Sequence, residues 1–181
     1  MIKFLDINKS KAVRRLVRRL YSSAFPIAER APFVFLQYRS KSNCADFFAV
    51  YDNEQFAGLV YNIYYKDLVY VFYLAVDADC RSKGYGSKIL KEIQQRFKEK
   101  RLILSIEEVN PDSANYEQRK RRKAFYEKNG FRDSGVRVAE LGVIYEVMLY
   151  GEHTSKEEYM QMMKSFTGNI IYNMFYKNLA E

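Results

Sequence analysis

The sequence is poor in the residues on which several enzyme mechanisms depend. It has one histidine, His153, two cysteines, Cys44 and Cys80, three prolines and no tryptophan in 181 residues. The two cysteines are far apart and belong to no Cys/His spacing, which excludes a disulfide framework and the common zinc motifs. A single histidine also leaves little room for a Ser-His-Asp triad. We therefore expect two reduced thiols, partly or wholly buried, and no metal site.

Long apolar stretches are missing as well. The longest apolar run is Leu68–Val76. It is much shorter than the roughly 18 to 20 residues that a membrane-spanning helix needs. Residues 1–21 lack the central apolar stretch of a signal peptide,. These absences predict a soluble, cytoplasmic protein without a membrane partner.

Acidic residues are scarce where basic residues are concentrated. The chain has 30 Lys and Arg against 22 Asp and Glu, which gives a formal net charge of +8. Residues 9–20 hold six basic side chains and no acid, and residues 115–130 hold six more against two acids. The excess therefore lies in two short segments. It indicates an anionic partner, which could be a nucleic acid, a membrane or a phosphorylated ligand.

The rest of the composition is that of an ordinary folded domain. Apolar residues make up 48% and charged residues 29%, so that disordered, collagenous and coiled-coil classes are excluded. The length fits one domain, with or without a small extension. Hydrophobic periodicity predicts strands at 2–7, 45–51, 56–65, 68–76, 101–109, 131–141 and 143–150, and helices at 13–20, 33–38, from Gly86 to Lys100, and at 115–129,.

The last thirty residues read as helical. Thr154 and Glu157 have the spacing of a capping box, and Gly168 is expected to end the helix that follows it. An apolar stripe on this helix packs on the domain, on a second copy or over the acceptor cleft; its members are Tyr159, Met162, Met163 and Phe166. A further helix is predicted to contain Ile170, Ile171, Met174 and Phe175.

The most informative segment runs from Leu74 to Ser87, where an apolar strand leads through a loop with Gly84 and Gly86 into a helix. Such a turn gathers free backbone N–H groups at the positive end of a helix dipole, which is how proteins hold a pyrophosphate. Position 89 is isoleucine, so the dinucleotide fingerprint G-x-G-x-x-G is absent, and no Walker A motif occurs,. The segment is either a phosphate-binding loop or a plain strand-to-helix connection.

These residues resemble the GCN5-related N-acetyltransferases. Their loop signature stands here as Arg81-Ser82-Lys83-Gly84-Tyr85-Gly86, preceded by the strand Tyr73–Val76, and a late-helix motif stands as Phe125–Phe131. The resemblance covers residues 2–150 and is close over 74–131. It implies an α/β (α+β) fold in which helices flank a mixed, mostly antiparallel sheet. We expect an acyltransferase domain at 1–151 and a helical extension at 152–181 that packs on the domain or on a partner subunit of a homodimer.

The resemblance also implies a binding mode for acetyl-coenzyme A. Backbone groups of Leu74 and Val76, with Ala75 between them, would pair with the pantetheine, and Arg81 would lie near the phosphates. The pyrophosphate would be bound by backbone N–H groups of Ser82, Lys83, Gly84, Tyr85, Gly86 and Ser87.

Four side chains are candidates for chemistry or for phosphate contacts. Tyr126 occupies the family position of the general acid, although it could also only pack or bind cofactor. Glu107 follows an apolar strand and is a candidate base, with Glu108, a water molecule or a purely salt-bridged role as alternatives,. Arg119 and Arg122 replace an Asn and an Ala that many family members carry, and they either contact coenzyme A phosphates or form a solvated face.

The sequence therefore predicts an acetyl-coenzyme A-dependent N-acetyltransferase that acts by direct attack of a primary amine and needs no metal. The acceptor, a small molecule or a peptide, is not specified. The alternative is a non-catalytic coenzyme A-binding regulator or a basic nucleic-acid-binding protein, although no nucleic-acid motif or aromatic platform is present. The arginines of the first helix are either solvated or border the acceptor site, where they would favour acidic acceptors; they are Arg14, Arg15, Arg18 and Arg19.

Overall fold

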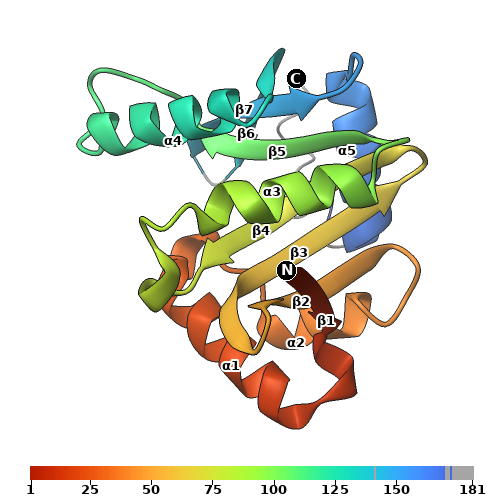
Figure 1. The fold of residues 1–181 in the computed structure, drawn as a ribbon. Helices are drawn as coiled ribbons and strands as arrows, with labels where there is room; N and C mark the ends of the chain where they lie inside the picture. The colour runs from red at the N-terminus through yellow and green to blue at the C-terminus, as the bar shows by residue number, and fades with distance from the viewer. Residues whose placement is uncertain (141, 170–171, 173–181) are drawn as a thin grey trace. The chain divides into compact units, whose positions relative to one another are not determined.

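The structure is a computed structural model that describes residues 1–140, 142–169 and 172. Its elements follow the predicted order, with one helix after the last strand (Figure 1). They are β1 (Ile2–Asp6), α1 (Lys11–Ala24), α2 (Phe33–Arg39), β2 (Ala45–Asp52), β3 (Gln55–Tyr65), β4 (Leu68–Val76), α3 (Tyr85–Arg96), β5 (Arg101–Glu107), α4 (Tyr116–Lys128), β6 (Arg132–Glu140), β7 (Val143–Tyr150) and α5 (Lys156–Thr167), together with the short 3-10 turns η1 (Ile7–Lys9), η2 (Ile27–Glu29) and η3 (Ala78–Cys80).

The strands form one seven-stranded sheet in the order β1-β2-β3-β4-β5-β7-β6. Strands β4 and β5 are parallel, and their pairing joins Leu68–Tyr70 to Arg101–Ile103. The pairs β1–β2, β2–β3, β5–β7 and β6–β7 are antiparallel. The predicted mixed, mostly antiparallel sheet flanked by helices is confirmed.

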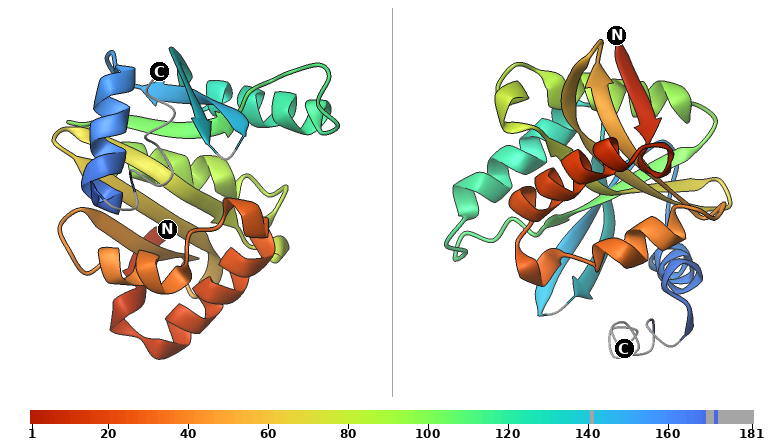
Figure 2. Two further views of the ribbon diagram at one scale, coloured as in Figure 1. Left: turned by 180° about the vertical axis from the view of Figure 1, so that it is seen from behind. Right: turned by 90° about the horizontal axis from the view of Figure 1, so that it is seen from below.

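The chain divides into two compact units, and the first comprises Met1–Tyr64 and Val71–Lys98. Helices α1 and α2 cover one face of its strands and α3 covers the other (Figures 1 and 2). A cluster of aromatic rings fills the space under α1 and α2, with ring centroids 5.0 Å apart for both Tyr21–Tyr73 and Phe47–Tyr61. Aromatic residues on strands pack well on a pleated, buried surface, which explains the aromatic-rich sequence of β2, β3 and β4.

The second unit comprises Tyr65–Tyr70 and Glu99–Glu181. In it, α4 and α5 lie on opposite faces of β5, β7 and β6 (Figure 2). The apolar stripe of α5 is buried, with no side chain of its four members more than 2% exposed. Arg101 at the start of β5 contacts Asp67 at 2.7 Å and Glu158 at 2.9 Å. It thus links the turn before β4 to the first turn of α5. The ring of Tyr159 in this stripe lies 5.6 Å from that of Tyr70, which belongs to the same unit.

Three local expectations were wrong. The capping box of α5 is formed by Ser155 and Glu158, one residue later than predicted, because Arg101 holds the Glu158 carboxylate beside the Ser155 amide while Thr154 is fully buried. The helical spacing of the sequence places Leu16 on one apolar face with Val13, Val17 and Leu20, but Leu16 is 40% exposed. Successive helical residues turn by about 100°, and Leu16 lies at the edge of that face. Strand β5 ends at Glu107, because the Val109 amide is bonded to a glutamate side chain of β7.

The remaining expectations concern the last residues, the end of α5, the two cysteines and membrane-spanning helices. The predicted helix with Ile170, Ile171, Met174 and Phe175 lies outside the described residues, and the division at residues 151 and 152 stays a prediction. Gly168 ends α5 with a φ of 79°, as expected. Both cysteines are free thiols, with Cys80 buried and Cys44 partly exposed. No helix in the described part of the chain is long and apolar enough to cross a membrane.

Candidate active site

The first unit contains the predicted phosphate-binding loop between β4 and α3. Two residues of the loop have positive φ angles, 59° at Ser82 and 76° at Gly84. Gly84 precedes the first turn of α3, and no side chain caps that turn. The first N–H groups of a helix have no partner within the helix, so those of Tyr85, Gly86 and Ser87 remain for another acceptor. Free N–H groups at a helix N-terminus are the kind of donors that proteins use to bind anions.

The two basic side chains of this loop fold back on the preceding segment. The Arg81 Nε donates to the Val76 carbonyl oxygen at 3.3 Å, and the Lys83 ammonium donates to the Asp79 carbonyl oxygen at 2.7 Å. Both side chains therefore stabilise the turn as well as adding positive charge to it. The residues from Arg81 to Gly84 are exposed.

Sequence reasoning missed Gly58, which lies in β3 opposite the end of β4. A methyl group at Gly58 would lie 2.3 Å from the Ala75 carbonyl oxygen and 3.4 Å from the Val76 Cα. Next to this contact, the Asp77 amide donates to the Ala57 carbonyl oxygen at 2.9 Å. Only a glycine allows the two backbones to approach so closely. A lone glycine inside a strand pattern is the signal that could have identified it.

A second missed residue is Tyr73, beside the predicted pantetheine segment. Its hydroxyl donates to the Glu29 carbonyl oxygen at 2.8 Å and accepts from the Ala31 amide at 3.0 Å. The Tyr21 hydroxyl donates to the Ala31 carbonyl oxygen at 2.8 Å, and burial raises the pKa of Tyr21 above its usual range, with Tyr73 adding to the effect. The two tyrosines thus fix the connection between α1 and α2 against β4. Sequence periodicity carries no signal for such contacts.

The second unit brings together the candidate base and the two arginines. Glu107, at the end of β5, pairs with Arg119 at 2.7 Å and with Arg122 at 3.7 Å. Its second oxygen also accepts from the Asn115 amide at 3.3 Å. Glu107 and Arg119 are about equally buried, at 15% and 16% exposure. The ion pair that the sequence left open for Glu107 is therefore present in the structure, and its role as a base stays a prediction.

Glu108 differs from Glu107 in its surroundings. Its carboxylate lies 3.4 Å from Arg137 of β6 and is about one-third exposed, while its carbonyl oxygen accepts from Arg119 at 2.9 Å. The two adjacent glutamates thus contact different elements, Glu107 on the α4 side and Glu108 on the β6 side.

Tyr126 is half-buried in α4, between the rings of Phe125 and Phe131, with centroid distances of 5.1 and 6.0 Å. Its hydroxyl has no hydrogen-bond partner among the described residues. Burial raises the pKa of Tyr126, and the nearby Arg122 opposes this effect. The phenol is therefore protonated at neutral pH, as an acid must be before it acts.

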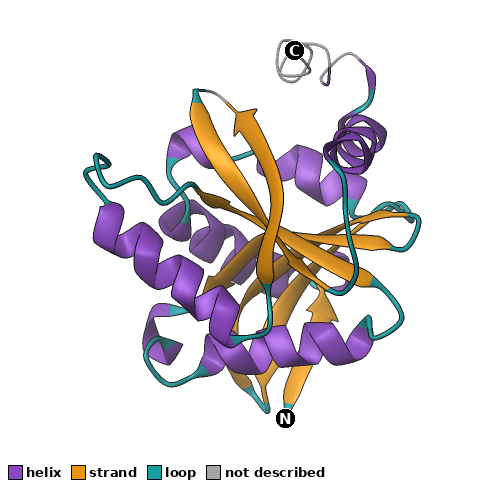
Figure 3. Ribbon diagram, turned by 90° about the horizontal axis from the view of Figure 1, so that it is seen from above, coloured by secondary structure: helices purple, strands orange, loops and turns teal. Residues whose placement is uncertain are grey.

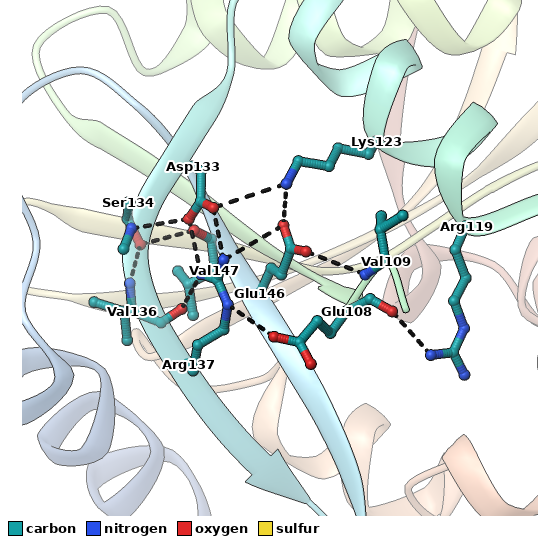
Figure 4. A network of polar contacts seen from close by, with 11 residues as sticks. Glu108, Val109, Arg119, Lys123, Asp133, Ser134, Val136, Arg137, Glu146 and Val147 are labelled. Atoms are coloured by element: carbon teal, nitrogen blue, oxygen red, sulfur yellow. Dashed lines mark hydrogen bonds and ion pairs between the residues drawn. The ribbon is translucent and has the colours of Figure 1, made fainter. Parts of the chain in front are cut away.

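A polar network around Glu146 was not predicted. This β7 carboxylate is buried, and it contacts the Lys123 ammonium at 2.5 Å and the Val109 amide at 3.1 Å (Figure 4). Arg137 and Asp133 of β6 extend the network at 2.7 Å from each other. The network links Val109, just after β5, to Lys123 in the middle of α4 through Glu146. The helices, strands and loops of the described chain are coloured by type in Figure 3. In this network the Glu146 carboxylate neutralises the positive charge of Lys123, one of the basic residues of α4.

Fold and loop together define the class of the protein. A mixed seven-stranded sheet is combined with a loop that leads from β4 through η3 to the uncapped N-terminus of α3. Residues 43–133 match the model of the acetyltransferase (GNAT) domain. The chain therefore belongs to the GNAT family of acetyltransferases, and the family predicted from the loop and late-helix motifs is confirmed.

Solved structures of low sequence identity share this fold. A GNAT-family protein of Bacteroides thetaiotaomicron is 18% identical, with a TM-score of 0.73 over 95% of this chain and 98% of that one. The ribosomal-protein-S18-alanine N-acetyltransferase of Escherichia coli is 15% identical, with a TM-score of 0.60 over 87% and 97%. An aminoglycoside 6'-N-acetyltransferase in complex with coenzyme A is 14% identical, with a TM-score of 0.63 over 86% and 99%. No curated protein matches this sequence.

Proposed function

We propose that the protein transfers an acetyl group from acetyl-coenzyme A to a primary amine. The observation that carries the proposal is the turn after β4, where Ser82 and Gly84 adopt left-handed conformations and leave the N-terminus of α3 uncapped. Backbone N–H groups from Ser82 to Ser87 would bind the pyrophosphate. The likeness to a fold solved with coenzyme A supports this cofactor.

The pantetheine would pair with backbone groups of Leu74, Ala75 and Val76. An N–H group on this part of β4 would polarise the thioester carbonyl. The amine nitrogen then attacks the carbonyl carbon, the C–S bond breaks, and coenzyme A leaves as a thiolate that takes up a proton.

Tyr126 is the candidate donor of that proton, and Glu107 is the candidate acceptor of the proton that the amine loses. The Tyr126 phenol is protonated at neutral pH, as a proton donor must be before it acts,. One oxygen of Glu107 is bonded to Arg119 and the other to Asn115. Each carboxylate oxygen has a second lone pair, and these lone pairs would accept the proton. Arg119 and Arg122 would then have a second role, in which they contact phosphates of coenzyme A.

Calorimetry with acetyl-coenzyme A tests the cofactor, and we expect a dissociation constant in the micromolar range. Gly84→Asp adds negative charge and bulk at the pyrophosphate and should abolish binding. Gly135→Asp is a matched control, because Gly135 also has a positive φ of 78° and open space around it, but it lies in β6. Equal affinity of wild type and Gly84→Asp would refute the placement of the loop, and absence of binding by the wild type would refute the proposed function.

The acceptor is best found by thiol release in a screen of amines. The similar structures include enzymes named for an amino-terminal alanine and for an aminoglycoside, so the screen should contain peptides, aminoglycosides, polyamines and amino acids. Glu107→Gln, compared with Glu108→Gln, tests the base. If Glu107 accepts the proton, only its variant loses the acidic limb of the pH–rate profile. If Glu107 is purely structural, both profiles keep their shape and the Glu107 variant loses stability.

A further inference from the structure

The two basic segments of the chain differ in how their charge is compensated. On α4, Arg119 and Arg122 pair with Glu107, and Lys123 pairs with Glu146. On η1 and α1, Lys9, Lys11 and the four arginines have no carboxylate partner within ion-pair distance among the described residues. Within the described residues, the six basic side chains of η1 and α1 thus form a group whose charge no nearby carboxylate neutralises.

The exposed side of α1 carries this charge in an ordered row. Helix α1 buries Val13, Val17, Leu20 and Tyr21, whereas a basic face remains exposed that consists of Lys11, Arg15, Arg18 and Arg19. Lys11, Arg15 and Arg19 follow one another at intervals of four residues, which is about 6 Å along the helix axis. Like charges at this spacing repel each other and destabilise a helix. An anionic partner would remove that repulsion.

The basic face also includes an apolar patch. Leu16 is 40% exposed, and a shallow hollow is lined by Ala12, Arg15, Leu16 and Arg19. Two guanidinium groups thus flank an apolar floor. A nucleic-acid backbone would leave that floor unused, and no aromatic side chain lines the hollow to stack a base. An acidic peptide with an apolar side chain between its carboxylates fits both features.

We propose that the basic face of α1 is a docking surface for an acidic protein segment in extended conformation. Carboxylates at alternate residues of an extended chain repeat at about 6.6 Å, close to the spacing of the basic row. An apolar side chain beside them covers Leu16 and Ala12. Arginine suits this partner because its planar guanidinium binds a carboxylate through two parallel hydrogen bonds. The proposal goes beyond the proposed acetyl transfer and does not depend on it.

Fluorescence anisotropy with a labelled peptide tests the proposal. The probe is Glu-Ser-Glu-Ser-Leu-Ser-Glu, in which the glutamates and the leucine point to the same side of an extended chain. Its amino terminus is acetylated, so that it cannot serve as an acetyl acceptor. The double variant Arg15→Glu, Arg19→Glu should weaken binding by about tenfold or more. The control is Lys120→Glu, Lys128→Glu, which changes the net charge equally on exposed residues of α4 and should alter affinity less than about threefold.

Three results would overturn the proposal. The first is an equal loss of affinity in both double variants, which would reduce the effect to net charge. The second is tighter binding of a single-stranded oligonucleotide of matched charge, with the same dependence on Arg15 and Arg19, which would make the surface a nucleic-acid site. The third is unchanged affinity when leucine in the probe is replaced by serine. Acetyl-coenzyme A binding, measured on the same samples, should be the same in all variants, and this separates docking from the proposed function.

Discussion

Replacement of Gly58 by alanine should both destabilise the fold and weaken acetyl-coenzyme A binding. The new methyl group would lie 2.3 Å from the Ala75 carbonyl oxygen, whereas real Cβ atoms do not approach closer than 3.0 Å, so the end of β4 must move by at least about 0.7 Å. Overpacking of this kind costs about 1–3 kcal/mol of folding free energy. The same displacement stretches a hydrogen bond of about 2.9 Å beyond its useful range. Loss of one or two such bonds to pantetheine, each contributing about 0.5–1.5 kcal/mol, corresponds to roughly tenfold lower affinity.

The assay pairs urea unfolding, followed by circular dichroism, with calorimetry of acetyl-coenzyme A binding. Gly135→Ala serves as the control, because Gly135 has a positive φ of 78° and a methyl group there would meet no atom within 4 Å. That control should lose about 1 kcal/mol of stability and keep its affinity for the cofactor. The comparison separates a general loss of stability from a displacement of β4.

Two results would refute the reasoning. If Gly58→Ala keeps wild-type stability, then the close approach of β3 and β4 is not rigid. If it is destabilised but binds acetyl-coenzyme A as the wild type does, then the backbone of Ala75 and Val76 is not part of the cofactor site. The second result would leave the loop at Gly84, together with Arg119 and Arg122, as the proposed cofactor contacts.

Three further predictions concern the second unit. Tyr126→Phe should lower kcat about 100-fold and leave acetyl-coenzyme A affinity within about twofold, and an unchanged kcat at every pH would remove the phenol as the acid. Arg101→Met should lower the free energy of unfolding by about 2 kcal/mol, measured in urea, because it releases Asp67 and Glu158 together; Arg101→Lys should restore only part of this. Arg137 lowers the pKa of Asp133 to about 2, so the stability from this pair is present above the unfolded pKa of about 3.9 and is lost as the pH falls toward 2. Urea titrations at about pH 6 and about pH 2.5 give the loss of unfolding free energy on acidification. This loss should be smaller in Asp133→Asn than in the wild type by only about 1 kcal/mol, since the pair is partly exposed.

The charge distribution takes on a different meaning once the ion pairs are known. Both basic segments look alike in sequence, and either could face an anionic ligand. In the structure, Arg119, Arg122 and Lys123 have carboxylate partners on β5 and β7, so part of the charge of α4 stabilises the second unit. The excess of α1 has no such partners among the described residues, and it is this helix that carries the argument for an acidic partner.

The sequence alone determined the elements, their order and the family. Apolar periodicity located the strands and helices because burial against one sheet imposes periods of 2 and 3.6 residues. The spacing of Arg81, Gly84 and Gly86 predicted the turn before α3, where Gly84 adopts the left-handed conformation that favours glycine,. Only the tertiary structure decided which charges are paired, that both Glu107 oxygens are engaged, and that Gly58 lies against Ala75. These features join residues that are distant in the chain, so their geometry depends on how separate elements pack, and no local pattern in the sequence records it.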